Sequence, residues 1–147
     1  MASSTSILVN NNKILFILRD NKPEIPDPNT WQLPGGGVEE GEDHFQAIQR
    51  ELNEEISIVP QNLIELGTAP GDTKVFFAYL SDEEVRKIHL CNEGQRLEFY
   101  SFEDSLKINL TKKLNFYFTN FKDGVVELVK NGNVDNKASL GFIADKL

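Results

Sequence analysis

Cysteine and histidine are scarce in this chain, and their scarcity excludes disulfide-stabilised folds and cysteine-rich zinc sites. Cys91 is the single cysteine among 147 residues, and one thiol cannot form an internal disulfide. We expect it to be a small, half-buried apolar residue. The two histidines, His44 and His89, have no partner at a zinc-binding spacing. We expect His44 to be exposed, and we assign neither ring a catalytic role.

Long apolar runs are also missing. No stretch approaches the ~20 apolar residues that a membrane-spanning helix needs. Residues 1–12 lack the basic start and the apolar run of a secretory signal. We therefore expect a cytoplasmic protein that does not bind membranes.

Positive charge is in short supply. The chain has 15 Lys and Arg residues against 23 Asp and Glu residues, a formal net charge of −8. Such a surface repels a phosphate backbone, which disfavours binding to long nucleic acids. Small phosphorylated ligands are not excluded, because a divalent cation can reverse the local sign of a carboxylate cluster.

Apolar residues are plentiful enough for a core, at 39% of the chain with ten Phe. The length predicts one domain over residues 1–147. Hydrophobic patterns predict strands at 6–9, 13–19, 31–33, 63–68, 74–80 and 98–102, and helices at 42–56 and around 110–121. Turns are predicted at residues 10–12, where three Asn follow one another, and at Gly71-Asp72. Residues 20–30 read as an ordered surface loop, and the tail from 131 to 147 is ambiguous. This mixture indicates an α/β or α+β sandwich.

The helix predicted at 42–56 carries an acidic face. At about 100° per residue, Glu51, Glu54 and Glu55 fall on one side of it, which we call the carboxylate cluster. An apolar stripe runs beside them, is expected to pack into the core, and consists of Phe45, Ile48, Leu52 and Ile56. A solvated acidic face explains most helices of this kind. Arg50 within the cluster and a glycine-rich loop just before the helix favour a ligand site instead.

The surrounding motif resembles that of a known family. Residues 36–58 read GGVEEGEDHFQAIQRELNEEISI, which resembles the Nudix box, G-x5-E-x7-R-E-U-x-E-E-x-G-U, where U is a bulky aliphatic residue. The matching positions are Gly36, Glu42, Arg50, Glu51, Leu52, Glu54, Glu55 and Ile58. Ser57 stands where the pattern has glycine, a departure that concerns the turn after the helix. The preceding residues 31–36, WQLPGG, also resemble the family's lead-in.

The resemblance implies a Nudix-type β-α-β sandwich, with a mixed sheet flanked by helices, and a metal at the cluster. Glu54 and Glu55 are then the Mg²⁺ ligands, with Mn²⁺ as a substitute, and the backbone carbonyl of Gly35 adds another oxygen. Glu51 is either the base that activates water or a further metal ligand, since members of the family differ on this point.

Three further residues of the motif are expected to assist at this site. Arg50 is expected to orient the glutamates through charge-assisted hydrogen bonds, and Gly36 to let the backbone approach the site. Glu42 either supports the site from behind or is simply a favourable charge at the helix start.

A second segment, Glu93-Gly94-Gln95 followed by Phe99, resembles one found in MutT-type members of the family. In those members the glutamate reaches the metal from outside the box, which implies Glu93 as an extra ligand. The alternative is a polar turn with a solvated glutamate.

The resemblance implies hydrolysis of a pyrophosphate bond in a nucleoside-diphosphate-linked substrate. A MutT-like nucleoside triphosphate pyrophosphatase, which yields a nucleoside monophosphate and pyrophosphate, fits the short chain and the second segment. Alternatives are a nucleotide-sugar or dinucleoside polyphosphate hydrolase, with the 20–30 loop shaping the pocket, and a non-catalytic nucleotide-binding module. The intact charged residues of the box argue against the module. Candidate residues for binding the substrate are Trp31 and Asn109, followed by Phe77, Tyr79 and Asn115.

Overall fold

The computed structural model describes residues 2–91, 93–135 and 138–142. The strands are β1 (Ser3–Asn10), β2 (Lys13–Leu18), β3 (Trp31–Gln32), β4 (Gly35–Gly37), β5 (Ile64–Ala69), β6 (Thr73–Tyr79) and β7 (Arg96–Tyr100). The helices are α1 (His44–Ile56), α2 (Asp82–Lys87), α3 (Phe102–Ser105), α4 (Lys112–Asn120) and α5 (Lys122–Asn131), followed by the 3-10 turn η1 (Ala138–Leu140). None of the described helices is long and apolar enough to cross a bilayer.

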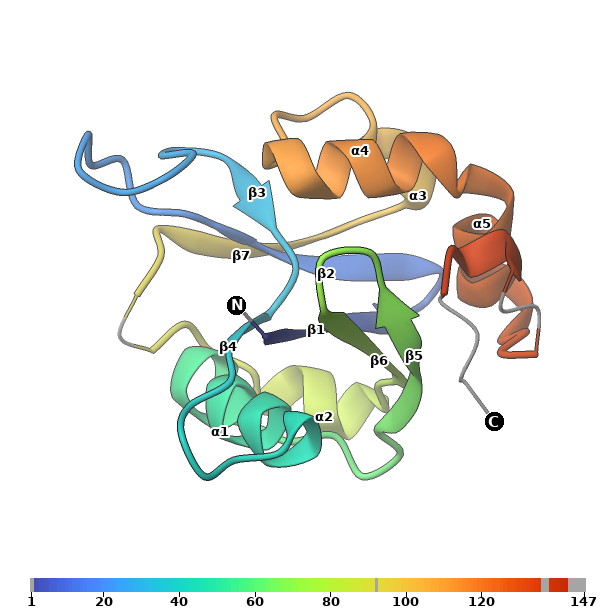
Figure 1. The fold of residues 1–147 in the computed structure, drawn as a ribbon, viewed down its shortest axis with the longest axis horizontal. Coiled ribbons are helices and arrows are strands. Elements are labelled where there is room, and N and C mark those ends of the chain that lie inside the picture. The colour runs from blue at the N-terminus through green and yellow to red at the C-terminus, as the bar shows by residue number, and fades with distance from the viewer. Residues whose placement is uncertain (1, 92, 136–137, 143–147) are drawn as a thin grey trace.

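The seven strands form one mixed sheet in which β1 is central. The main path runs β3-β2-β1-β6-β5, while β4 pairs with β1 and β7 with β2. β1 and β6 run parallel, and the other paired strands among the described residues run antiparallel. Helices α1 and α2 cover one face, and α3, α4 and α5 cover the other (Figure 1). The predicted layered fold with a mixed sheet is confirmed.

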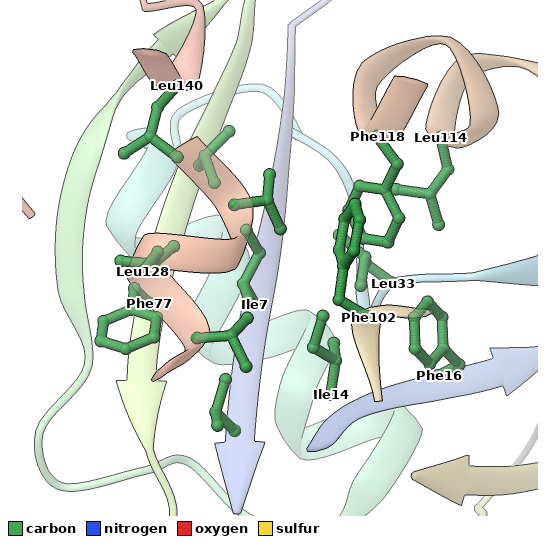
Figure 2. Close-up of a cluster of buried hydrophobic side chains, with 14 of the residues drawn as sticks. Ile7, Ile14, Phe16, Leu33, Phe77, Phe102, Leu114, Phe118, Leu128 and Leu140 are labelled. Carbon is green, nitrogen blue, oxygen red and sulfur yellow. The ribbon is translucent and has the colours of Figure 1, made fainter. Parts of the chain in front are cut away.

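Alternation along the strands divides the core into two clusters. Leu8, Leu15 and Phe76 point toward α1 and pack with the helix stripe. Their neighbours Ile7 and Phe16 point to the opposite face, where they meet α3, α4 and α5. Figure 2 shows this second cluster, whose helix side chains include Phe102, Leu114, Phe118 and Leu128. The period of two that defines a strand therefore places successive residues in different layers.

Turns between the strands follow their predicted chemistry. Asn11 and Asn12 adopt φ angles of 53° and 59° at the tip of the β1–β2 hairpin, and Asp72 adopts 58° between β5 and β6. Short polar side chains tolerate this left-handed region better than other non-glycine residues. Both predicted turns are confirmed.

The prediction of two helices was incomplete. The helix expected around 110–121 ends at Asn120, and Phe121, with φ −124° and ψ 34°, separates α4 from α5. Two further helices, α2 and α3, are capped at their N-termini by Ser81 and Ser101. The side chains of these residues accept hydrogen bonds from backbone N–H groups of the first turn. The strand expected at 98–102 stops at Tyr100, because Ser101 already caps α3.

Three predictions of side-chain exposure were wrong. Phe45 is 42% exposed, since Ala47 takes the buried position in the first turn of α1. His44 is half-buried, because its Nδ1 lies 3.2 Å from Ser4 Oγ and 3.1 Å from the carbonyl oxygen of Ser3. Cys91 is exposed rather than half-buried.

The ambiguous tail contributes to the core. Leu140 of η1 is fully buried beside α5, and the hydroxyl of Tyr117 donates to its carbonyl oxygen over 2.6 Å. Residues 136–137 and 143–147 lie outside the described residues.

Candidate functional site

The ends of α1 set where its acidic face lies. Asp43 caps the first turn by accepting a hydrogen bond from the Gln46 N–H over 2.7 Å, and Gln46 Oε1 accepts from the Asp43 N–H over 2.9 Å. The helix thus begins at His44 rather than at Glu42, which lies just before the cap. Ser57 ends the helix with φ 71° and ψ 6°, a left-handed conformation. Ser57 stands where the motif has glycine. Glycine adopts this left-handed conformation without a steric penalty, which explains why the motif has it here.

Arg50 is the hub of the charged residues. Its Nε and Nη2 donate to the two oxygens of Glu42 over 2.8 and 3.0 Å, and Nη1 donates to Glu51 Oε1 over 2.9 Å. Nη2 also donates to the carbonyl oxygen of Gly37 over 3.0 Å. The hydrogen bonds from Arg50 lower the pKa of Glu42, and those to Glu42 and Glu51 raise the pKa of Arg50. Arg50 therefore fixes the Glu51 carboxylate and joins α1 to the glycine strand, our name for β4.

The glycine strand lies directly against the carboxylates. A Cβ atom on Gly36 would lie 2.5–2.8 Å from the carboxylate atoms of Glu51, whereas one on Gly37 would have no neighbour within 4 Å. Gly35, with φ 148°, donates its N–H to Glu55 Oε1 over 2.8 Å. Gly35 and Gly36 are thus required by close approach, and each touches a different glutamate.

Glu55 is electrostatically unusual. Burial, with smaller contributions from the negative charges of Glu51, Glu93 and Glu54, raises its pKa to about 8, although the Gly35 hydrogen bond opposes the shift. Glu93 lies 38 positions beyond Glu55 in the sequence. The fold therefore brings the charge of Glu93 close enough to α1 to raise the pKa of Glu55. Glu54 is more open, with a side chain 54% exposed and Arg50 Nη1 3.5 Å away.

The donor set fits a hard divalent cation. Carboxylate oxygens are the ligands that Mg²⁺ prefers. A cation would relieve the repulsion from Glu51, Glu93 and Glu54, which adds to the effect of burial on the pKa of Glu55. Within residues 2–91, 93–135 and 138–142, no three acidic, His or Cys side chains already converge as a complete metal-binding group. A bound ion would have to draw the carboxylates together, or take part of its oxygen ligands from the phosphates of the substrate.

A cavity of about 250 Å³ adjoins the glycine strand. It extends from Gly35 and Gly36 across the start of β1 and β6 to α4. Its apolar lining includes Ile7, Leu33, Ala69, Pro70, Val75, Leu114, Phe116, Tyr117 and Phe121. The same two glycines therefore border both the carboxylates and the cavity.

The polar side chains of the cavity form a short chain of contacts. Lys113 Nζ donates to Thr73 Oγ1 over 2.6 Å, and Thr73 Oγ1 lies 2.8 Å from Ser3 Oγ. Sequence reasoning missed these residues, since they come from β1, β6 and α4 and share no motif. The parallel pairing of Ser3 with Thr73 is a register that no local pattern reveals.

The residues predicted to bind substrate lie elsewhere. Trp31 is 8% exposed, and its ring meets Tyr100 edge-to-face at 5.3 Å, with the Arg96 guanidinium 5.7 Å from the ring centre. Asn109 accepts a backbone hydrogen bond from Trp31 over 2.8 Å. Neither is among the described residues that line the cavity.

The lower-ranked candidates are placed as follows. Phe77 is buried and Asn115 is exposed. The Tyr79 hydroxyl donates to backbone carbonyls of Leu128 and Val129. None of the three is among the described residues that border the cavity.

Comparison with known proteins places these features in a family. The model of the NUDIX domain matches residues 2–120. The RNA pyrophosphohydrolase of Ruthia magnifica subsp. Calyptogena magnifica is 26% identical over 117 residues, 78% of this chain and 63% of that protein. The RNA pyrophosphohydrolase of Francisella tularensis subsp. mediasiatica is 38% identical over 101 residues, 67% of this chain and 59% of that protein. The chain thus spans less than two thirds of the length of these relatives.

Solved structures share the fold. The MutT protein from Methanosarcina mazei Go1 superposes with a TM-score of 0.65 at 22% identity, covering 85% of this chain and 94% of that one. A C. elegans Ap4A hydrolase, solved as a binary complex, superposes with a TM-score of 0.61 at 22% identity, covering 84% and 97%. At such identities the likeness concerns the fold alone.

Proposed function

The chain belongs to the NUDIX family, and from this premise we propose that it is a Mg²⁺-dependent hydrolase of nucleoside-diphosphate-linked substrates. The reaction is cleavage of a pyrophosphate bond. The substrate we favour is a nucleoside triphosphate, cut to a nucleoside monophosphate and pyrophosphate. One observation carries the proposal: Gly35 and Gly36 separate a group of carboxylates from a mainly apolar cavity.

This arrangement offers separate places for the two halves of a nucleotide. The cavity is lined mainly by apolar side chains, which suits a nucleoside. The carboxylates suit phosphates only when a cation is present. Glu54 and Glu55 would hold that ion, with Glu93 and the Gly35 carbonyl oxygen as further ligands. When bound, Mg²⁺ neutralises phosphate oxygens and stabilises charge on the leaving oxygen.

The remaining chemistry belongs to the side chains. Water attacks one phosphorus atom, the bridging oxygen leaves, and Glu51 accepts the proton of the water. Arg50 keeps the Glu51 carboxylate in position through the 2.9 Å hydrogen bond from Nη1. Glu42 in turn holds the guanidinium with two hydrogen bonds, so Glu42 and Arg50 act as positioning residues.

The test is product formation from a panel of compounds. Nucleoside triphosphates, a nucleotide sugar and a dinucleoside polyphosphate are incubated with the protein and Mg²⁺, and products are identified by chromatography. We expect nucleoside monophosphate and pyrophosphate, with no products in excess chelator. Glu51→Gln, which keeps the size of the side chain, should lower kcat by several orders of magnitude while the melting curve stays cooperative. Equal turnover by this variant would remove Glu51 from the mechanism.

A second candidate substrate is the 5′-triphosphate end of an RNA. The favouring observation is the similarity to the two relatives described above, both of which are named RNA pyrophosphohydrolases. The net charge of −8 opposes it, because a long phosphate backbone is repelled. A 5′-triphosphorylated oligonucleotide in the same panel separates the two substrates. If its kcat/KM exceeds that of every free nucleotide, RNA ends are the substrate.

A further inference from the structure

Lys113 is a cation placed at the wall of a mainly apolar cavity. Its Nζ donates to the hydroxyl of Thr73 over 2.6 Å, and Thr73 is only 5% exposed. Among the described residues, no carboxylate lies within 4.0 Å of this ammonium group. Lys113 is exposed as a whole residue, and its ammonium group contacts a neutral hydroxyl beside the cavity.

Aromatic side chains border the same cavity as Lys113. Phe116, one turn further along α4, is 61% exposed and borders the same cavity. Tyr117 is half-buried, and its hydroxyl is already bonded to the Leu140 carbonyl oxygen. A flat ring system entering the cavity would therefore meet apolar surface over its faces and a hydrogen-bond donor at one edge.

The sheet register gives the distance between this donor and the glycine strand. Gly37 pairs with Ser3, and Ser3 pairs with Thr73, so Thr73 lies two strands away from β4. Two strand spacings amount to about 10 Å. Lys113 therefore lies well away from the carboxylates, toward the end of the substrate that is not cleaved.

We propose that Lys113, positioned by Thr73, selects nucleobases that present hydrogen-bond acceptors, and so favours keto bases over amino bases. The inference rests on the proposed function, because it assigns the cavity to the base of a nucleotide substrate. An ammonium group has three donors and no acceptor. One donor is used by Thr73, which leaves two for the ligand.

The two remaining donors can distinguish keto bases from amino bases. Guanine presents two neighbouring acceptors, N7 and O6, and thymine and uracil present O4. Adenine and cytosine place an amino group at the corresponding position, which would face the ammonium group donor to donor. A pair of good hydrogen bonds to a base edge changes discrimination by about 5- to 150-fold.

The experiment compares Lys113→Met with Lys112→Met. Methionine keeps the length and apolar stem of lysine but removes the donors. Lys112 is an exposed neighbour on the same helix and is not among the described cavity residues, so its variant is the matched control. The readout is kcat/KM for GTP, ITP and ATP, and for UTP and CTP. ITP has the keto group of guanine without its 2-amino group and isolates the 6-position.

We expect the wild type and Lys112→Met to prefer GTP and ITP over ATP, and UTP over CTP, by at least about 5-fold. Lys113→Met should lose most of both preferences, because its kcat/KM should fall more for GTP, ITP and UTP than for ATP and CTP. An equal fall for all five nucleotides would overturn the proposal, because it would place Lys113 on a phosphate. Absence of any preference in the wild type would overturn it as well.

Binding measured without turnover separates this inference from the proposed function. Calorimetric titration of GMP and AMP, in chelator, reports base preference independently of cleavage. Tighter GMP binding that Lys113→Met abolishes would support the assignment even if no nucleotide is hydrolysed. Hydrolysis with equal GMP and AMP affinities would leave the proposed function intact and refute the role of Lys113.

Discussion

The backbone N–H of Gly35 donates to Oε1 of Glu55 over 2.8 Å, which ties the glycine strand to a carboxyl group with a raised pKa. The bond favours the charged form of Glu55, but burial and the neighbouring glutamates outweigh it. The metal-free protein therefore keeps a proton on Glu55 under conditions where an ordinary carboxyl group has lost it.

This proton makes the stability of the metal-free protein depend on pH. The pKa of Glu55 is about 8 in the folded protein against 4.5 ordinarily, so the folded state retains a proton that the unfolded state releases. The free energy of unfolding should fall as pH rises from about 4.5 to 8. Melting temperatures in chelator across this range measure the effect, and Glu55→Gln should flatten the slope. An unchanged slope in the variant would assign the effect to another group.

Removal of Mg²⁺ should matter most at high pH. The ion and the proton compete for Glu55, so the stabilisation by Mg²⁺ should be small near pH 5 and larger near pH 8. Melting scans with Mg²⁺ and with sodium at equal ionic strength provide the comparison. Identical melting temperatures in both salts at pH 8 would indicate a solvated acidic face without a metal site.

Gly36 and Gly37 give a matched pair of substitutions on one strand. In Gly36→Ala the new methyl group would lie 2.5–2.8 Å from atoms of the Glu51 carboxylate, whereas in Gly37→Ala it would meet nothing within 4 Å. Gly36→Ala should lower kcat at least about 10-fold, a loss of about 1.4 kcal/mol, by displacing Glu51. Gly37→Ala should stay near the wild-type value. Steady-state kinetics with the best substrate decide the matter, and equal kcat values for the two variants would contradict the geometry.

Glu93→Gln tests whether the segment after Cys91 serves the metal. Glu93 raises the pKa of Glu55 by its charge, and loss of that charge should weaken Mg²⁺ binding. Turnover should fall by about 10- to 1000-fold, which corresponds to ~1.4–4 kcal/mol, and high Mg²⁺ should restore part of it. The control is Glu24→Gln, at an exposed position in the 20–30 loop. If kcat against Mg²⁺ concentration is superimposable for wild type and Glu93→Gln, Glu93 is not a ligand.

Ser57→Gly tests the departure from the motif. Ser57 has φ 71°, a conformation that costs an ordinary L-residue about 1–2 kcal/mol. Glycine relieves that cost but adds up to about 1 kcal/mol of unfolded-state entropy. We expect a net gain of up to about 1 kcal/mol in the free energy of unfolding and unchanged kcat. Urea unfolding measures it, with Ser57→Ala as a control that should be no more stable than wild type.

The strands other than β4, and the helix α1, were predictable because their signals are local. The apolar run at 14–18 and the three- and four-residue spacing of Ile48, Leu52 and Ile56 depend only on neighbouring residues. The turn at Asn11 and Asn12 is equally local. Helices α2 and α3 carried a readable signal in Ser81 and Ser101, each followed three residues later by an acidic residue.

The cavity could not be predicted in this way. Thr73 and Lys113 are 40 positions apart, and only the pairing of β6 with β1 and the packing of α4 bring them together. The aromatic ring of Trp31 suggests a stacking surface in the sequence, whereas in the fold the residue is 8% exposed and its ring meets Tyr100 edge-to-face. Burial is decided by tertiary packing, which composition does not encode.

The glycine strand has a consequence for how the protein can change. Cleavage is assigned to side chains of α1, whereas recognition is assigned to side chains of β6 and α4, and Gly35 and Gly36 contribute only backbone to either. Substitutions at Thr73, Lys113 or Phe116 can therefore change which ligand the cavity prefers without moving a carboxylate. A library of variants confined to these three positions can be selected for new substrates, because the residues assigned to cleavage stay the same in every variant.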